Sequence, residues 1–190
     1  MIKRLRPAHS DEMIAELYAK PYDHLQWDEH VERVRWTIAR LNTFLSLRSE
    51  IAFAVDLSCG DGAVLRGLSE PIDRMYGDLV DAPHLTIEHG PIEERVRQVT
   101  GDLLICSETL EHLNDPYMFL HDASKSFKWV AITTPLGEDD PEKNYEHYWG
   151  WDTLGIATIL DTTGWQGVWL DTLNLPYYTY QMWIARSTWH

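Results

Sequence analysis

The sequence predicts a single α/β domain built on a mostly parallel, doubly wound sheet. Two observations support this prediction. From Ile51 onward, apolar runs alternate with helix-like or polar segments, and a glycine-containing turn follows the first of these runs. Such alternation is typical of strands that are wound with helices into a parallel sheet. A chain of 190 residues is long enough for one well-buried core and short for two.

The residues ahead of the sheet, 1–48, are expected to be helical. Ser10 is suited to cap a helix that runs to about Lys20, and Asp28 is suited to cap a second one. In that second segment, apolar residues recur at helical spacing: Val31, Val34, Ile38, Leu41 and Leu45.

The core is expected to span residues 49–190. Its first strands are predicted at the apolar runs 51–57, 72–76, 84–88, 102–106 and 129–133. A helix-like stretch follows Trp151 and ends near Gly164. The strand-like segments 165–170 and 178–185 then flank a turn, so they are predicted to close the sheet as a hairpin with an antiparallel C-terminal strand.

Charge and composition narrow the choice of partners and compartment. Asp and Glu outnumber Lys and Arg by 30 to 16, which gives a net charge of -14. Such a chain repels a phosphate backbone on average, so a long nucleic acid is a disfavoured partner. No apolar run is long enough for a membrane span, no signal peptide is recognisable, and two cysteines are too few for a disulfide framework. We therefore expect a cytoplasmic protein without membrane attachment.

The turn after the first predicted strand is the main candidate for a cofactor site, because open α/β sheets bind ligands at the carboxyl ends of their strands. Residues 56–62 have the sequence Asp-Leu-Ser-Cys-Gly-Asp-Gly. Gly60 and Gly62 permit close approach of the backbone to a cofactor. Asp61 opposes a pyrophosphate and tolerates a sulfonium. Asp78, which ends the second strand, is expected to accept hydrogen bonds from ribose hydroxyls.

These residues resemble the cofactor motifs of the class I S-adenosylmethionine-dependent methyltransferases, which have a Rossmann-like fold. The resemblance runs from about Tyr22 to the end and includes the segment 102–113, Asp-Leu-Leu-Ile-Cys-Ser-Glu-Thr-Leu-Glu-His-Leu. It implies a set of residues that bind S-adenosylmethionine: Asp56, Ser58, Cys59, Gly60, Gly62, Asp78, Ile92 and Ser107. Ser58 departs from the family pattern, which usually has glycine there, and this change is expected to lower cofactor affinity.

The resemblance also implies a role for the N-terminal segment. Residues 1–48 would form a helical lid over the pocket, with four side chains facing inward: Tyr22, His24, Trp27 and His30. The same residues would equally serve as ordinary packing.

Candidate catalytic and metal-binding residues follow the fourth strand. On a helical turn, Glu108, Glu111 and His112 share one face because they are three and four residues apart. With His147 from a later loop, they resemble the Glu-x-x-Glu-His site of metal-dependent O-methyltransferases, including small-RNA 3′-end 2′-O-methyltransferases and ubiquinone-pathway O-methyltransferases. The resemblance implies Mg, Mn, Fe or Zn at these four residues, lowering the pKa of a substrate hydroxyl. Without a metal, the general base would be His112 or His147.

The sequence therefore predicts an S-adenosylmethionine-dependent methyltransferase that methylates a hydroxyl of a small-molecule or terminal substrate, with Glu108, His112 and His147 as catalytic residues. Three alternatives stay open: a metal-free N- or C-methyltransferase, a cofactor-binding partner protein without turnover, and a nicotinamide oxidoreductase. Asp61 argues against the last of these.

Overall fold

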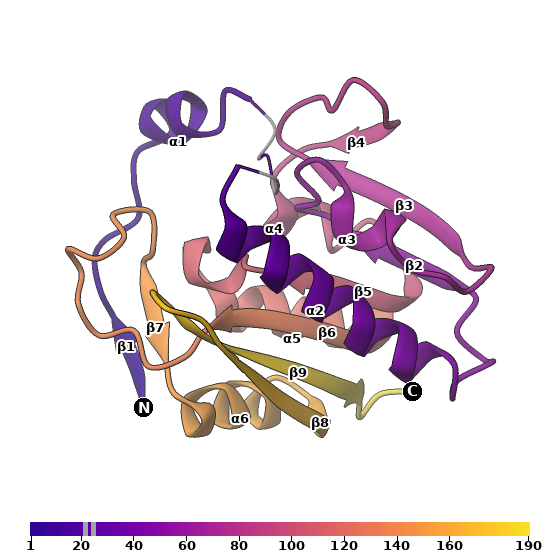
Figure 1. Ribbon diagram of the computed structural model, residues 1–190. Coiled ribbons are helices and arrows are strands. Elements are labelled where there is room, and N and C mark those ends of the chain that lie inside the picture. Colours follow the sequence, from indigo (N-terminus) through magenta and orange to yellow (C-terminus); the bar gives the residue numbers. More distant parts are fainter. Residues whose placement is uncertain (21–22, 24–25) are drawn as a thin grey trace.

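The computed structural model describes residues 1–20, 23 and 26–190 (Figure 1). Its main sheet has seven strands, in the spatial order β4 (Ile87–His89), β3 (Asp73–Asp78), β2 (Phe53–Asp56), β5 (Gly101–Ser107), β6 (Phe127–Pro135), β9 (Thr179–Ser187) and β8 (Trp165–Asn174). The first five strands in this spatial order, from β4 through β3, β2 and β5 to β6, pair in parallel. In contrast, β9 runs antiparallel to both β6 and β8. The predicted mostly parallel sheet and its closing hairpin are confirmed.

The order of the strands creates a switch point in the middle of the sheet. From β2 the chain moves outward to β3 and β4, and it then returns to the other side of β2 to form β5. The connections leaving β2 and β5 therefore diverge, and the crevice between them is where folds of this kind bind ligands.

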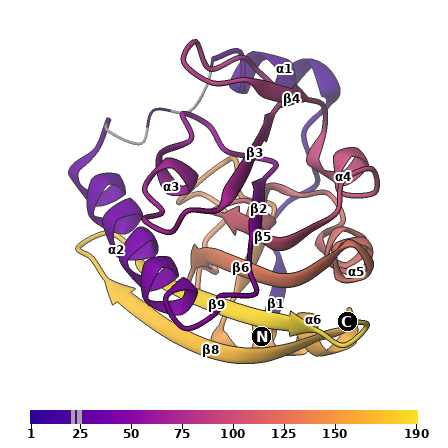
Figure 2. The ribbon, with the colours of Figure 1, turned by 90° about the vertical axis from the view of Figure 1, so that its right-hand side faces the viewer.

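Helices cover both faces of the sheet (Figure 2). α2 (Asp28–Leu45) and α3 (Ala63–Arg66) pack on one face, against inward side chains such as Ala54 and Leu103. α4 (Ile92–Arg95), α5 (Pro116–Ser126) and α6 (Thr153–Thr162) contribute to the opposite layer, with Val55 and Leu104. Neighbouring residues of a strand thus enter different cores, which explains why the central strands are continuous apolar runs.

The N-terminal helices agree with the sequence except in one cap. α1 (Asp11–Leu17) is capped by Ser10, whose Oγ accepts the Met13 N–H at 3.4 Å. α2 begins at Asp28, so the cap position falls on Trp27, which makes no side-chain capping bond. The predicted cap at Asp28 is wrong by one residue. Its carboxylate instead lies in the first turn, where it interacts favourably with the helix dipole.

The first residues form a strand that the sequence did not predict. β1 (Ile2–Arg4) pairs antiparallel with β7 (Trp149–Trp151), and Ile2 lies opposite Trp151. Gly150 is required in this ladder, because a Cβ there would lie 1.9 Å from the Glu138 carbonyl oxygen. The loop after β6 therefore packs closely on the small sheet.

The expected lid over residues 1–48 consists of three different parts. β1 belongs to the small sheet, and α2 contributes Leu41 and Phe44 to a hydrophobic core. α1 and the chain around it border the cavity described below, and a lid role for them stays a prediction. Two residues expected to face inward from the lid, Tyr22 and His24, lie outside the described residues. None of the helices in the described ranges has the length and apolarity that crossing a membrane requires.

Asp102 fastens the start of β5 to that of β2, and we expect its loss to destabilise the fold. Its carboxylate accepts the N–H groups of Ala52 and Phe53 at 2.9 and 3.0 Å and the ammonium of Lys128 at 2.7 Å. Burial raises the pKa of Asp102, but these hydrogen bonds outweigh burial and hold the pKa below its ordinary value. Asp102→Ala should lower the free energy of unfolding by about 1–2 kcal/mol at pH 7 in urea denaturation.

The same contacts fix how this effect depends on pH. Because the pKa of Asp102 is lowered in the folded state, its stabilisation is complete above about pH 4, the ordinary pKa of an aspartate, and is lost as the pH falls through the lowered pKa. The difference between wild type and Asp102→Ala should shrink over that interval. Equal urea midpoints at pH 7 would contradict the assigned role.

Candidate functional site

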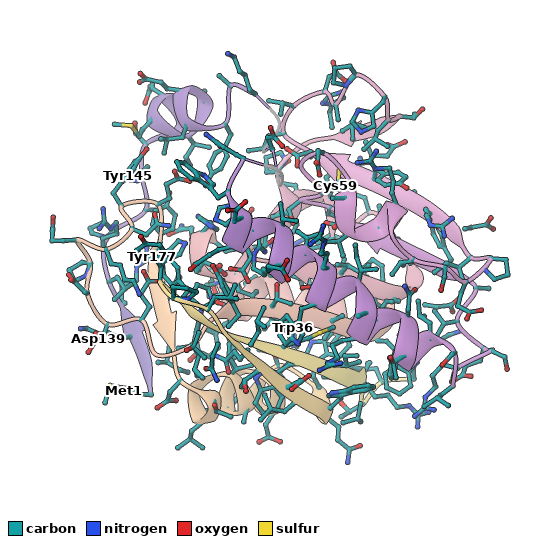
Figure 3. The ribbon with its side chains drawn as sticks, in the orientation of Figure 1. Met1, Trp36, Cys59, Asp139, Tyr145 and Tyr177 are labelled. Carbon is teal, nitrogen blue, oxygen red and sulfur yellow. The ribbon has the colours of Figure 1, made fainter. Side chains whose placement is uncertain are left out.

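A cavity of about 640 Å³ opens at the carboxyl ends of the central strands. Its walls come from the turn after β2, the ends of β3 and β5, the start of α4, the segment 144–148, and the β8–β9 hairpin. Cys59 marks the β2–β3 side of this region, and Tyr145 and Tyr177 mark the opposite side (Figure 3). Segments distant in the sequence thus meet around one hollow at the switch point.

The turn after β2 is held in shape by two aspartates. Asp56 is 3% exposed, and its Oδ1 accepts the Ser58 N–H at 3.1 Å. Burial, with the nearby charge of Asp78 adding to it, raises the pKa of Asp56 to about 7. Asp78 Oδ2 accepts the Gly60 N–H at 2.8 Å, and Gly60 adopts a left-handed φ of 54°. The turn therefore depends on Asp78 for its conformation.

The predicted cofactor residues divide into two groups. Those that line the cavity are Ser58, Gly60, Asp78, Ile92 and Ser107.

The remaining predicted cofactor residues, Asp56, Cys59 and Gly62, do not line the cavity. Cys59 packs with Ala82 and Ile87 in a small core. Gly62 has a φ of 75°, and a Cβ there would lie 2.6 Å from the Leu85 side chain. Gly62 thus meets a packing requirement of the turn. Of the two glycines, only Gly60 lines the cavity, and its close approach to a cofactor stays a prediction.

Two hydroxyl pairs connect the strand ends at the floor of the cavity. Ser58 Oγ lies 2.7 Å from Thr109 Oγ1, which links the turn after β2 to the segment after β5. Ser107 Oγ lies 2.9 Å from Thr133 Oγ1 on β6. Ser58, which stands where the family that the sequence resembles usually has glycine, therefore makes a contact that glycine cannot make.

Glu108 differs from its predicted geometry. The expected helical turn over residues 108–112 begins only with the 3₁₀ turn η1 (Leu110–His112), because Glu108 adopts a left-handed φ of 52°. Its N–H donates to the Thr133 carbonyl at 2.9 Å, which continues the pairing of β5 with β6. The predicted common face of the three residues is therefore wrong for Glu108. A strained backbone of this kind is unfavourable for a glutamate and is found mainly at functional sites.

The other three predicted metal ligands do come together. One ligand atom from each of Glu111, His112 and His147 lies within 4.8 Å of the others. The two imidazole rings meet edge to face, with centroids 4.8 Å apart. Glu111 is fully buried; its Oε2 accepts the Thr134 hydroxyl at 3.1 Å, and its Oε1 has no hydrogen-bond partner within the described part of the chain.

Hydrogen bonds define the state of both imidazoles. His112 Nδ1 lies 3.1 Å from the Glu146 carbonyl, which can only accept, so Nδ1 carries the proton and Nε2 keeps its lone pair. Burial lowers the pKa of His112 to about 3, and the ring is therefore neutral at physiological pH. His147 donates from Nδ1 to Glu138, while its Nε2 accepts the Asn144 amide at 2.9 Å.

Glu138 is a site residue that the sequence analysis missed. It lies in an acidic, proline-containing segment after β6, and charged segments with proline are typical of solvated loops. The Glu138 side chain is in fact 2% exposed and bonded to His147, and its Oε1 is buried without a partner among the described residues. Its place in the sequence could have indicated a role in the site, because Glu138 follows the end of β6 at the same edge of the sheet as the predicted site residues.

The fold and site together define a class: a doubly wound α/β protein with one antiparallel strand near the sheet edge and a ligand cavity at the switch point. No family model matches the sequence, and no curated protein matches it. Solved structures do match the fold. Magnesium protoporphyrin IX methyltransferase from Synechocystis PCC 6803, solved with S-adenosylmethionine, superposes with a TM-score of 0.70 at 13% identity, covering 96% of this chain and 99% of that one.

Two further structures have the same arrangement. Burkholderia thailandensis 1,6-didemethyltoxoflavin-N1-methyltransferase, solved with S-adenosylhomocysteine, gives a TM-score of 0.68 at 14% identity, covering 98% of this chain and 95% of that one. An S-adenosylmethionine-dependent methyltransferase from Archaeoglobus fulgidus gives 0.65 at 14% identity, covering 81% and 94%. This chain therefore has the Rossmann-like fold that these methyltransferases share.

Proposed function

We propose that this chain is an S-adenosylmethionine-dependent methyltransferase that methylates a hydroxyl of a small-molecule or terminal substrate with the help of a divalent metal. The main supporting observation is that one cavity is lined both by the turn after β2 with Asp78 and by His112 and His147, two members of the Glu111–His112–His147 cluster, whose third member, Glu111, is buried behind them. The first set suits a cofactor and the second suits a reacting group, and methyl transfer requires the two to be aligned in one space.

The cavity lining fits the proposed cofactor. Its walls carry the carboxylates of Asp78, Glu93, Glu94 and Glu108, which favour a sulfonium cation over a pyrophosphate. In this proposal, Asp78 accepts hydrogen bonds from the ribose, and Ile92, buried at the start of α4, covers the adenine. Asp61, whose Oδ1 accepts the Ala63 N–H at 2.9 Å, adds negative charge ahead of α3.

The Glu111–His112–His147 cluster offers donor atoms that suit a divalent ion. Glu111 offers a buried oxygen without a partner, and His112 offers a neutral nitrogen. Metal-binding histidines usually donate their other ring N–H to a carboxylate or a carbonyl, as His147 does to Glu138 and His112 to Glu146. An ion at these residues would act as a Lewis acid on the substrate hydroxyl. The Asn144 amide would have to leave His147 Nε2 for that nitrogen to bind.

A metal-free N- or C-methyltransferase is the second candidate, and that same Asn144 contact favours it. With Asn144 on Nε2 and Glu138 on Nδ1, both nitrogens of His147 are already engaged. A carboxylate-oriented imidazole is also the usual arrangement of a general base. In this alternative, Glu138 orients His147, no ion takes part, and the Asn144 amide would likewise have to leave Nε2 before that nitrogen could accept a proton.

Calorimetric titration with S-adenosylhomocysteine tests the proposal. We expect micromolar binding of this product and no comparable binding of NAD. The titration is repeated with Mn²⁺ and with EDTA to show whether cofactor binding depends on the ion. In a separate activity assay, methylation of an acceptor that requires the ion would favour the metal-assisted reaction. A folded protein that binds no S-adenosylhomocysteine under any of these conditions would contradict the proposed activity.

Glu111→Gln should separate metal binding from folding. A glutamine keeps an oxygen for the Thr134 hydroxyl and stays neutral in a site with no exposure to solvent, so the fold should be retained. It removes the anionic ligand, and Mn²⁺ affinity in calorimetry should fall by about tenfold or more. Glu142→Gln, at an exposed position of the acidic loop after β6, is the matched control. Unchanged Mn²⁺ affinity in Glu111→Gln would rule out the cluster as the metal site.

A further inference from the structure

We propose that Arg33 binds an anionic group, a carboxylate or a phosphate, on the methyl acceptor. This inference rests on the proposed function and narrows its substrate class to an acceptor that carries both a nucleophile and an oxyanion. Arg33 lies on α2, is 3% exposed, and lines the cavity. An arginine is charged at every physiological pH, so this position places a permanent cation in the cavity wall.

The guanidinium of Arg33 is incompletely paired. Its nearest carboxylate is Glu108, with Nη1 and Oε1 separated by 3.8 Å, which is too long for a hydrogen bond. Nη1 has no hydrogen-bond partner in the described ranges, and Glu108 Oε1 is likewise without one. The Tyr180 ring lies 5.7 Å from the guanidinium carbon. A buried charged donor left unpaired is costly, and a planar oxyanion is the ligand that a guanidinium binds best.

The position of Arg33 favours the acceptor over the cofactor. Two of the side chains close to its guanidinium are Glu108 after β5 and Tyr180 on β9. The turn proposed to hold the cofactor follows β2, which lies three strand positions from β9, or about 14 Å at the usual strand spacing. Glu108 directly follows β5 and lies three residues before Glu111, so Arg33 borders the side of the cavity where the acceptor would react.

The cavity that Arg33 lines also contains other groups that a planar anion can contact. Lys20 and His30, from the same N-terminal part of the chain, also line the cavity, as does Tyr178 beside Tyr180. The two tyrosines, 5.8 Å apart between ring centroids, supply an aromatic wall next to the cation. A flat, negatively charged acceptor would contact both.

The test uses simple aromatic probes on the intact chain. Benzoate, phenyl phosphate and the neutral benzamide are titrated by ligand-observed NMR in the presence of S-adenosylhomocysteine. Arg33→Gln is compared with Arg35→Gln, whose guanidinium on the same helix is 69% exposed and paired with Glu32. We expect the wild type to prefer at least one anion over benzamide. Arg33→Gln should weaken the binding of that anion by about tenfold. Arg33→Lys should recover part of the lost affinity, and Arg35→Gln should keep the wild-type affinity.

The outcomes separate this inference from the proposed function. Equal affinity for benzoate, phenyl phosphate and benzamide in the wild type overturns the inference even if every Arg33 variant misfolds. An Arg33→Gln protein that loses affinity for S-adenosylhomocysteine but keeps it for 5′-methylthioadenosine, which lacks the amino-acid part, also overturns it, because Arg33 would then bind the cofactor carboxylate. Failure of the wild type to bind S-adenosylhomocysteine at all counts against the proposed function instead.

Discussion

Asp78→Ala is expected to weaken the binding of S-adenosylhomocysteine by about 10- to 100-fold, the loss that follows removal of hydrogen bonds to a charged group. Two effects act in the same direction. The variant loses the proposed acceptor for the ribose hydroxyls. It also frees the Gly60 N–H, which Asp78 Oδ2 accepts at 2.8 Å, so the turn after β2 is no longer held against β3. Calorimetric titration of the purified variant measures the change.

Asp81→Ala is the matched control for this experiment. Asp81 lies three residues later, its side chain is 83% exposed, and it pairs with His89 rather than with the turn. Its removal should leave S-adenosylhomocysteine affinity within about twofold of wild type, the change expected of a surface substitution. Asp78→Asn adds a second comparison, because an amide keeps one acceptor oxygen without the charge. Equal affinity in wild type and Asp78→Ala would remove Asp78 from the cofactor site.

His112→Ala is expected to have the opposite profile: retained affinity for S-adenosylhomocysteine and a loss of turnover of about 100-fold or more, the usual contribution of a positioned acid, base or ligand. The His112 ring belongs to the Glu111–His112–His147 cluster. Its Nδ1 lies 3.2 Å from Tyr18 Oη and 3.1 Å from the Glu146 carbonyl oxygen. The release of S-adenosylhomocysteine is measured with an acceptor that the wild type methylates.

His121→Ala is the control for His112. His121 lies on α5, outside the cavity lining, so its replacement should change neither affinity nor turnover. A His112→Ala protein that loses cofactor affinity to the same extent as Asp78→Ala would contradict the division of the cavity into a cofactor side and a reacting side.

The central architecture could be predicted because it is encoded locally. Each buried strand of the parallel sheet is a short apolar run, and α2 repeats Val34, Leu41 and Leu45 at helical spacing on the face that enters the core. The turn after β2 was recognisable for the same reason, since its glycines and carboxylates are contiguous in the sequence. The position of this turn at the edge of the cavity then follows from the topology of the sheet, although only Gly60 among its glycines and carboxylates lines the cavity.

The remaining parts of the site depend on contacts that local patterns do not encode. Nothing in residues 107–112 indicates that Glu108 has a left-handed backbone, which directs its carboxylate toward Arg33 and away from a common helical face. Glu138 has the local sequence of a solvated loop, and its burial depends on β7 lying beneath it. Arg33 looks like any charged residue of an amphipathic helix until its neighbours are known.

The pairing of β1 with β7 also bears on the order in which the molecule assembles during synthesis. Ile2 can pair only after Trp151 has been synthesised. About 150 residues separate the two, which corresponds to roughly 8 to 30 seconds at ordinary rates of translation. The parallel strands of the large sheet up to β6 are complete earlier in the chain. The N-terminal strand cannot pair with β7 before that point, and we therefore expect the wall of the cavity that Ala8 and His9 supply to close after the parallel strands have formed.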